Sequence, residues 1–329
     1  MTLFFAYIKI LNQVILIKQD KLNIGHLSTA YHTNYVLMES EDLTSDLNIN
    51  INWILFGTGP AMVKAFKEEK LEIGYMGLPP AIIGIDQGVP IKCIAGGHVE
   101  GTILVAKKEY KTQKQLDNNL KKVFSQFKGK AIGVPSKGSI HDVILNYYLE
   151  KYNLLDEINV KNYGQAEFIA KDMREGILEA GVGTPALAVF ASTILESHLI
   201  IEAKDLWPDN PSYGIFAHNK LVQTEPELVL KFLYHHKYAS SLLRDSPLLA
   251  AEKIAKTFDI IDKNYAEAVL KISPKYCISL SEGYLKATMG FVKTLYKLKY
   301  IKQNLKLDDI FDFRFINKIH PEPTHYTIK

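Results

Sequence analysis

Residues 53–96 read WILFGTGPAMVKAFKEEKLEIGYMGLPPAIIGIDQGVPIKCIAG, and they give the clearest indication of fold class. Short apolar runs, typical of strands, alternate here with amphipathic segments that begin at a proline. Proline is favoured in the first turn of a helix, where its missing N–H is not needed, so Pro60 and the pair Pro79–Pro80 each predict a helix start. Strands that alternate with helices in this way indicate a parallel sheet covered by helices.

The same alternation extends to both sides of this stretch. Strands are predicted at 23–27, 50–56, 73–77, 91–95, 102–106, 130–134, around 160, 181–184, 199–201 and 212–217. Helices are predicted at 60–70, 79–88, 109–128 (a Lys-rich surface helix), 139–152, 166–175 and from 185 onward. From residue 226 to residue 300 the pattern predicts only helices.

This order predicts an α/β protein of two lobes, each a mostly parallel sheet flanked by helices, with a helical C-terminal extension. The 329 residues are too many for one ordinary core and suit two domains. We expect residues 20–107 and 213–329 to form the first lobe and residues 108–212 the second. Two chain crossings, near 102–108 and 212–218, would then form a hinge.

Charge and cysteine content exclude several classes of protein. The net charge is only +3, from 39 basic and 36 acidic residues, which does not indicate a nucleic-acid partner. Cys93 and Cys277 each lie among apolar residues and are predicted to be buried free thiols, with a single disulfide between them as the alternative. No C-x-x-C motif or Cys/His cluster predicts a metal site, and no cofactor is expected.

The N-terminal segment does not resemble a targeting sequence. Residues 3–17 are largely apolar, but Lys9, Asn12 and Gln13 interrupt them. There is no basic n-region, no small-residue cleavage site and no cysteine for a lipid anchor. The segment is also too short for a membrane span. These features favour a cytoplasmic protein or one whose export device lies outside this reading frame.

Two glycine-rich turns resemble nucleotide-binding motifs, but each lacks a required residue. Gly57-Thr58-Gly59 lacks the third glycine of the dinucleotide fingerprint, because Met62 stands there. The loop from Gly133 to Ser139 lacks the Lys-Ser/Thr pair of a phosphate loop. The loop nevertheless leads into a helix with free N–H groups at its start. These groups, together with the hydroxyls of Ser136 and Ser139, could bind an anion or polar group. The alternative is that Ser139 only caps its own helix, with Asp142 three residues on.

Histidine and tyrosine residues supply further candidates. His26, His98 and His141 lie at or just beyond predicted strand ends, where open α/β sheets bind ligands. His235-His236 lies within a helix and is predicted to face solvent. The motifs H-E-x-x-H and G-x-S-x-G are absent, so no catalytic residue is assigned. Tyr31 and Tyr213 are expected near the cleft.

Five spaced segments resemble the solute-binding proteins of ABC importers for sulfonates, taurine and nitrate. They are IGHLSTAYHT from Ile24, the stretch 53–96, FKGKAIGVPSKGSIHDVILNYYL from Phe127, REGILEAGVGTPALAVFA from Arg174 and EPELVLKFLYHHKYA from Glu225. The resemblance covers about residues 22–250, with the segments in the family's order. It implies a type II periplasmic-binding-protein fold.

The resemblance also implies a function and a site. It implies a monomer that captures a small polar or anionic molecule between its lobes, for an ABC permease, on the outer side of the membrane. No catalytic residue or metal is implied. The ligand-binding positions that it implies are His26, Leu27, Gly77, Leu78, Thr102, Ser136, Ser139, His141, Thr184 and Tyr213.

Departures from the family pattern leave an alternative function open. The acidic residue usual near Thr184 is missing, Arg174 is expected to be exposed, and no arginine is expected in the cleft. The same fold also serves enzymes of thiamine-precursor and menaquinone pathways, so a cytoplasmic enzyme with His26, His98 or His141 as acid or base is one alternative. A metabolite sensor is another. The cysteine-rich motif of the thiamine-precursor enzymes is absent.

Overall fold

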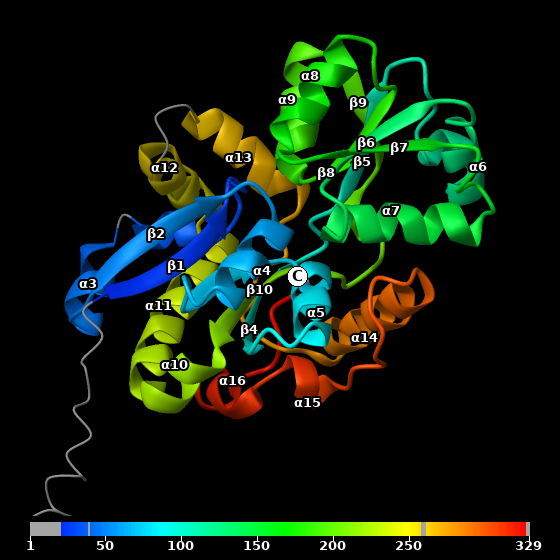
Figure 1. Cartoon of the computed structure of the whole chain (residues 1–329). Helices are drawn as coiled ribbons and strands as arrows, with labels where there is room; N and C mark the ends of the chain where they lie inside the picture. The colour runs from blue at the N-terminus through cyan, green and yellow to red at the C-terminus, as the bar shows by residue number, and fades with distance from the viewer. Residues whose placement is uncertain (1–20, 39, 258–260, 327–329) are drawn as a thin grey trace, which may run out of the picture.

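The computed structural model describes residues 21–38, 40–257 and 261–326, in which two five-stranded sheets are each flanked by helices (Figure 1). The predicted pattern at residues 3–17 lies outside the described residues. In the described part, no helix is both long and apolar enough to span a membrane. The first sheet contains β1 (Lys21–Leu27), β2 (Asn50–Phe56), β3 (Ile73–Met76), β4 (Ile91–Val99) and β10 (Pro211–His218), in the order β2-β1-β3-β10-β4.

The second sheet has the order β7-β6-β8-β5-β9. Its strands are β5 (Ile103–Lys107), β6 (Ala131–Pro135), β7 (Asn159–Tyr163), β8 (Ala180–Gly183) and β9 (Ser197–Ile201). We call the first sheet with its helices the first lobe and the second sheet with its helices the second lobe. Because β5 pairs with β8 and β9, the second lobe begins at residue 103, and the predicted start at residue 108 is too late.

Helices cover both sheets. The first lobe carries α2 (Asn34–Met38), α3 (Glu41–Leu47), α4 (Gly59–Lys67), α5 (Leu78–Asp86), α10 (Asn219–Thr224), α11 (Pro226–Asp245), α12 (Pro247–Thr257), α13 (Lys263–Ile272), α14 (Glu282–Lys297), α15 (Leu307–Ile310) and α16 (Phe313–Ile319). The second lobe carries α6 (Leu120–Ser125), α7 (Ile140–Lys151), α8 (Glu167–Arg174) and α9 (Pro185–Ile194).

Strand directions place the carboxyl edges of the two sheets opposite each other. In the first sheet β1, β2 and β3 are parallel, and β10 runs antiparallel to β3 and β4. The end of β4 at Val99 is paired with the start of β10 at Pro211. In the second sheet, the start of β5 at Ile103 is paired with the end of β8 at Gly183. Both crossings therefore join the carboxyl edges of the two sets of parallel strands, which is where α/β sheets bind ligands.

The predicted surface helix at 109–128 is largely wrong. The segment forms only a 3-10 turn at Lys114–Leu116 and the short helix α6. Between them, Asp117 and Asn118 both adopt positive φ angles of 56°, a left-handed conformation that ends a helix. A polar Lys-rich composition did not reveal this break.

The helices packed on the first sheet bury a side chain that was expected to face solvent. His236 is fully buried on α11, where its Nε2 atom lies 2.8 Å from the carbonyl oxygen of Gly96 and its Nδ1 atom 2.9 Å from Thr33 Oγ1. Its neighbour His235 contacts the Asp46 carboxylate at 3.1 Å near the surface. The prediction that both histidines face solvent is therefore wrong for His236.

Candidate functional site

A cavity of about 470 Å³ lies between the two lobes, a size suited to a small molecule. Turns after parallel strands, together with the first turns of the helices that follow them, form most of its wall, as the strand directions predict. Its lining residues are Leu27, Ser28, Thr29, Gly57, Thr58, Gly59, Gly77, Pro80, Pro135, Ser139, Ile140, His141, Ala166, Glu167, Ala170, Thr184, Ala186, Leu187, Phe190, Ile261, Asp262 and Tyr265.

Helix N-termini from both lobes meet at this cavity. The first turns of α4, α5, α7, α8 and α9 all contribute lining residues or cap residues. Pro60, Pro79 and Pro185 stand in the first turns of α4, α5 and α9. The N-terminus of a helix carries free N–H groups and a partial positive charge. The wall of the cavity is therefore suited to a polar or negatively charged group.

The start of α7 is held by a local hydrogen-bond network. Ser139 Oγ accepts a hydrogen bond of 3.2 Å from Asp142 N, which confirms the predicted N-cap. Gly138 has a φ of +82°, a conformation favourable for glycine, and its N–H donates to Asp142 Oδ2 at 2.9 Å. The Ser139 hydroxyl is thus a cap and also a lining residue, so the two interpretations of this loop are compatible.

His141 joins this helix to the first crossing between the lobes. A hydrogen bond of 3.0 Å connects His141 Nδ1 with Thr102 Oγ1, and both side chains are buried. Burial lowers the pKa of His141 to about 4, so its ring is neutral at pH 7. A neutral ring can offer a ligand one hydrogen bond without adding charge.

The charged groups of the lining are carboxylates. Among the described lining residues there is no Lys or Arg, whereas Glu167 and Asp262 both belong to the lining. Ser28 in the first lobe donates a hydrogen bond of 2.7 Å to Glu167 Oε1 in the second lobe. Asp262 caps α13 by accepting from Tyr265 N at 2.7 Å. Among the described lining residues, the helix N-termini are therefore the groups that can attract an anion.

Several further contacts connect the lobes around the cavity. Tyr265 on α13 donates a hydrogen bond of 3.1 Å to the carbonyl oxygen of Ala186 on α9, and Figure 1 shows these two helices side by side. On the other side, Tyr300 donates a hydrogen bond of 2.7 Å to Asp142 Oδ2 of α7. The described conformation is therefore one in which the lobes touch on both sides of the cavity.

The structure brings half of the predicted site residues to the cavity wall. Those that line it are Leu27, Gly77, Ser139, His141 and Thr184. Thr102 does not line the cavity, but its hydrogen bond to His141 positions that lining residue. Ser136 Oγ is buried and has no hydrogen-bond partner among the described residues, but Ser136 is not part of the wall.

The remaining predicted residues lie behind the wall. Leu78 and Tyr213 are fully buried, and the Tyr213 hydroxyl donates to Thr33 Oγ1 at 3.2 Å. Tyr31 is also buried, with its hydroxyl 2.7 Å from Ser212 Oγ. His26 is buried with its Nδ1 atom 3.2 Å from the Leu27 carbonyl oxygen, and burial lowers the pKa of its ring.

Sequence reasoning missed the side chains that α8, α9 and α13 contribute to the wall. Glu167 and Phe190 lie on α8 and α9, and Tyr265 comes from α13 in the C-terminal region. The acidic residue at the start of the helix predicted at 166–175 was a usable signal for Glu167. Nothing in the sequence indicates that α13 reaches across to α9.

A Cys/His group lies apart from the cavity and was not predicted. Cys277, His320 and His325 place one sulfur and two ring nitrogens within 4.8 Å of one another. Cys93, the other cysteine, is also a buried free thiol, as expected for both. The sequence pattern did not indicate the Cys/His group, because Cys277 lies more than 40 residues before the two histidines.

Comparison with known proteins identifies relatives of this fold. The family model described as the NMT1-like family matches residues 17–259. No curated protein gives a significant match in sequence. Among solved structures, the alkanesulfonate-binding protein SsuA from Xanthomonas axonopodis pv. citri, bound to MOPS, is 15% identical with a TM-score of 0.75, and the match covers 89% of this chain and 98% of that chain.

Two other solved structures have the same architecture. The ligand-binding component of an ABC-type import system from Staphylococcus aureus, with zinc bound, is 12% identical with a TM-score of 0.76, and 92% of this chain and 100% of that chain are covered. The periplasmic nitrate-binding protein NrtA from Synechocystis PCC 6803 is 9% identical with a TM-score of 0.73, and the coverages are 92% and 89%. The predicted two-lobed fold and the predicted resemblance are confirmed.

Proposed function

Because the chain belongs to the NMT1-like family and encloses a cavity between two lobes, we propose that it is the solute-binding protein of an ABC importer. It captures a small polar or anionic molecule, closes on it, and presents it to a permease on the outer side of the membrane. A monomer is sufficient for this task. The observation that carries the proposal is the cavity at the carboxyl edges of both sheets, beside the two crossings.

The chemistry of the wall indicates how a solute would be held. The helix N-termini and the Ser139 and Thr184 hydroxyls favour an oxyanion such as a sulfonate. The carboxylates of Glu167 and Asp262 favour a positive group at the other end of the ligand. We therefore propose a solute in which an anionic or polar head is joined to an ammonium or hydrogen-bond-donor group, as in aminoalkylsulfonates.

The environments of His98 and His141 give little support to the alternative function, an enzyme that uses a histidine as acid or base. His98 is fully buried, and burial lowers its pKa to about 3 while Nε2 lies 2.7 Å from the Ser273 carbonyl oxygen. His141 is neutral at pH 7 and is engaged by Thr102. The structural relatives described above are named as binding proteins.

A ligand panel tests the proposal. Purified protein is screened by thermal shift with taurine, ethanesulfonate, nitrate, phosphonates, carboxylates and pyrimidine precursors. Each compound that raises the melting temperature is then recovered, and its mass is measured by mass spectrometry. We expect taurine-like zwitterions to raise the melting temperature more than ethanesulfonate does, and to be recovered unchanged. Recovery of a chemically altered compound would contradict the proposed binding function and indicate an enzyme.

A further inference from the structure

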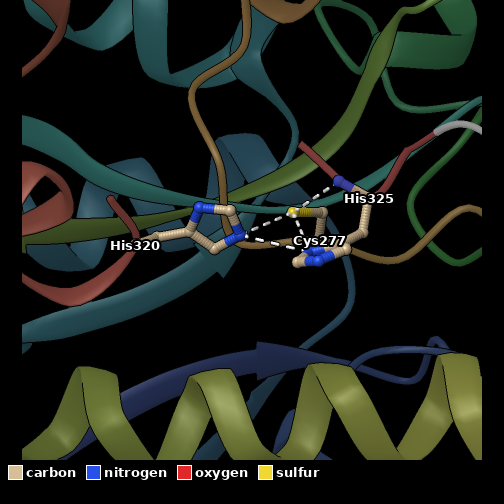
Figure 2. A group of neighbouring side chains, drawn as sticks. All are labelled: Cys277, His320 and His325. Atoms are coloured by element: carbon tan, nitrogen blue, oxygen red, sulfur yellow. Dashed lines mark hydrogen bonds between the residues drawn. The ribbon is translucent and has the colours of Figure 1, made fainter. Parts of the chain in front are cut away.

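Three side chains from separate segments converge at a second site in the first lobe. Cys277 follows α13, His320 follows α16, and His325 lies in the C-terminal segment. Figure 2 shows ring nitrogens of both histidines turned toward the Cys277 sulfur. Cys277 and His320 are 1% and 8% exposed and His325 is partly exposed, so a ligand here would be enclosed mainly on the side of Cys277 and His320. None of the three residues lines the cavity between the lobes.

The distances match those between the ligands of a tetrahedral zinc ion. Cys277 Sγ lies 3.2 Å from His320 Nε2 and 3.6 Å from His325 Nδ1, and the two nitrogens are 3.3 Å apart. Zinc bonds of about 2.3 Å to sulfur and about 2.0–2.1 Å to nitrogen, at tetrahedral angles, separate sulfur from nitrogen by about 3.6 Å and nitrogen from nitrogen by about 3.4 Å. Two of the three distances agree with these values and the third is about 0.4 Å shorter, so the three atoms are spaced closely enough to share one ion.

The surroundings of the sulfur favour a thiolate, the form that binds metal. The backbone N–H groups of His325 and Ser279 both donate to Cys277 Sγ, at 3.3 and 3.4 Å. The Tyr326 hydroxyl donates to the Cys277 carbonyl oxygen at 2.7 Å and to the Ser279 carbonyl oxygen at 3.1 Å, which holds the loop in place. Such supporting contacts orient ligands at metal sites.

We propose that Cys277, His320 and His325 bind a zinc ion. One thiolate and two imidazoles form a soft, tetrahedral donor set of the kind that zinc prefers. Glu322 Oε1 lies 3.8 Å from His320 Nε2, but its carboxylate is paired with Lys237. We therefore assign the fourth coordination position to a water molecule or another small ligand.

The site has a structural consequence for the C-terminal segment. Cys277 lies next to a residue that bridges to β4, since Tyr276 pairs with His98. The two histidines belong to the last described segment of the chain. A metal ion would thus fasten this segment to the sheet of the first lobe and stabilise the folded state, because binding energy at such a site adds to folding energy. Solute capture does not depend on it, so the two proposals can fail separately.

Metal titration of the full chain tests this proposal. Purified protein is stripped with a chelator and titrated with Zn²⁺ and, as a spectroscopic probe, with Co²⁺. We expect one ion per chain, a higher melting temperature with Zn²⁺, and a thiolate-to-cobalt charge-transfer band in the near ultraviolet with tetrahedral visible bands. Absence of Co²⁺ uptake by the wild-type chain would overturn the proposal.

Variants identify the ligands. Cys277→Ser should remove the charge-transfer band, and both Cys277→Ser and His325→Gln should weaken zinc binding by about 100-fold or more, because even changes in supporting residues cost about 10–100-fold. Cys93→Ser is the matched control, since Cys93 is a buried free thiol that donates to the Ala95 carbonyl oxygen. It should bind metal as the wild type does.

The partly exposed His325 keeps the test decisive if Cys277→Ser does not fold. Folded His325→Gln protein that binds zinc as tightly as the wild type would contradict the assignment. So would loss of the cobalt band in Cys93→Ser together with its retention in Cys277→Ser.

Discussion

Thr102 Oγ1 lies 3.0 Å from His141 Nδ1, so the first crossing between the lobes is hydrogen-bonded to a residue of the cavity wall. Both side chains are buried. The bond connects the crossing that would bend in the proposed hinge closure with the N-terminus of α7, which would contact the solute. A change in one position should therefore affect both stability and solute binding.

Replacement of Thr102 by Val tests this connection. The variant keeps the shape of the side chain but leaves a buried histidine nitrogen without its partner, which should lower the free energy of unfolding by about 1–3 kcal/mol. Thr102→Ser is the control, because it keeps the hydroxyl and loses one methyl group, at about 0.8 kcal/mol. Urea unfolding compares the two. A Val variant as stable as the wild type would show that the hydrogen bond contributes nothing.

Removal of the Tyr300 hydroxyl should weaken the closed state. Tyr300→Phe deletes the 2.7 Å bond to Asp142, while Gly138 N still donates to that carboxylate. We expect solute affinity to fall by up to about ten-fold, since a bond to a charged group contributes about 1.5–3 kcal/mol and only part of it depends on closure. Tyr296→Phe, at a tyrosine of α14 that is 54% exposed, is the control and should bind like the wild type. Calorimetric titration measures the solute affinity of both variants. Equal affinities would show that the Tyr300 hydroxyl does not stabilise the closed state.

The buried histidines predict a loss of stability in acid. Burial lowers the pKa of His236 and His141 to about 4 and that of His98 to about 3, whereas the unfolded chain binds these protons near pH 6.5. Below pH 6.5 the unfolded state therefore binds more protons than the folded state. Each histidine should lower the free energy of unfolding by about 1.4 kcal/mol for each pH unit between about 6 and its folded-state pKa. Above pH 7 this contribution is constant.

His236→Gln tests the acid effect at one position. The variant should be less stable at pH 7, but its stability should fall less between pH 6 and pH 5 than that of the wild type, by about 1 kcal/mol. His235→Gln, at the neighbouring residue near the surface, is the matched control for a change of His to Gln on α11. Denaturant unfolding at several pH values gives the slopes. An unchanged slope in His236→Gln would contradict the pKa assigned to this ring.

Much of the fold could be predicted because local rules and the global fold agree. The strand predicted at 50–56 is observed with the same limits, and the Ser139 cap is present as expected. Prolines in the first helical turn marked α4, α5 and α9 correctly. These features depend on neighbours within a few residues, and such signals are visible in a single sequence.

The parts that failed depend on the helix period or on distant contacts. His236 lies seven residues after the buried Val229 and four after the buried Phe232, which places it on the apolar stripe of α11. The helical period, applied at that position, would have predicted its burial. In contrast, Tyr265 reaches the cavity, and Cys277 meets His320 and His325, only through tertiary packing across long stretches of chain. Local patterns carry no information on those contacts.

Solute capture between the lobes is tested most directly by a blocked cavity. Thr184 lines the cavity at the start of α9 and its side chain makes no capping hydrogen bond, so Thr184→Phe fills the site at little cost to the helix. Thr193→Phe, near the other end of the same helix, is the matched control. Calorimetric titration with the solute selected by the ligand panel should show one molecule bound per chain in the wild type and in Thr193→Phe, and none in Thr184→Phe. Binding of wild-type strength by a folded Thr184→Phe protein would contradict the claim that the solute lies between the lobes.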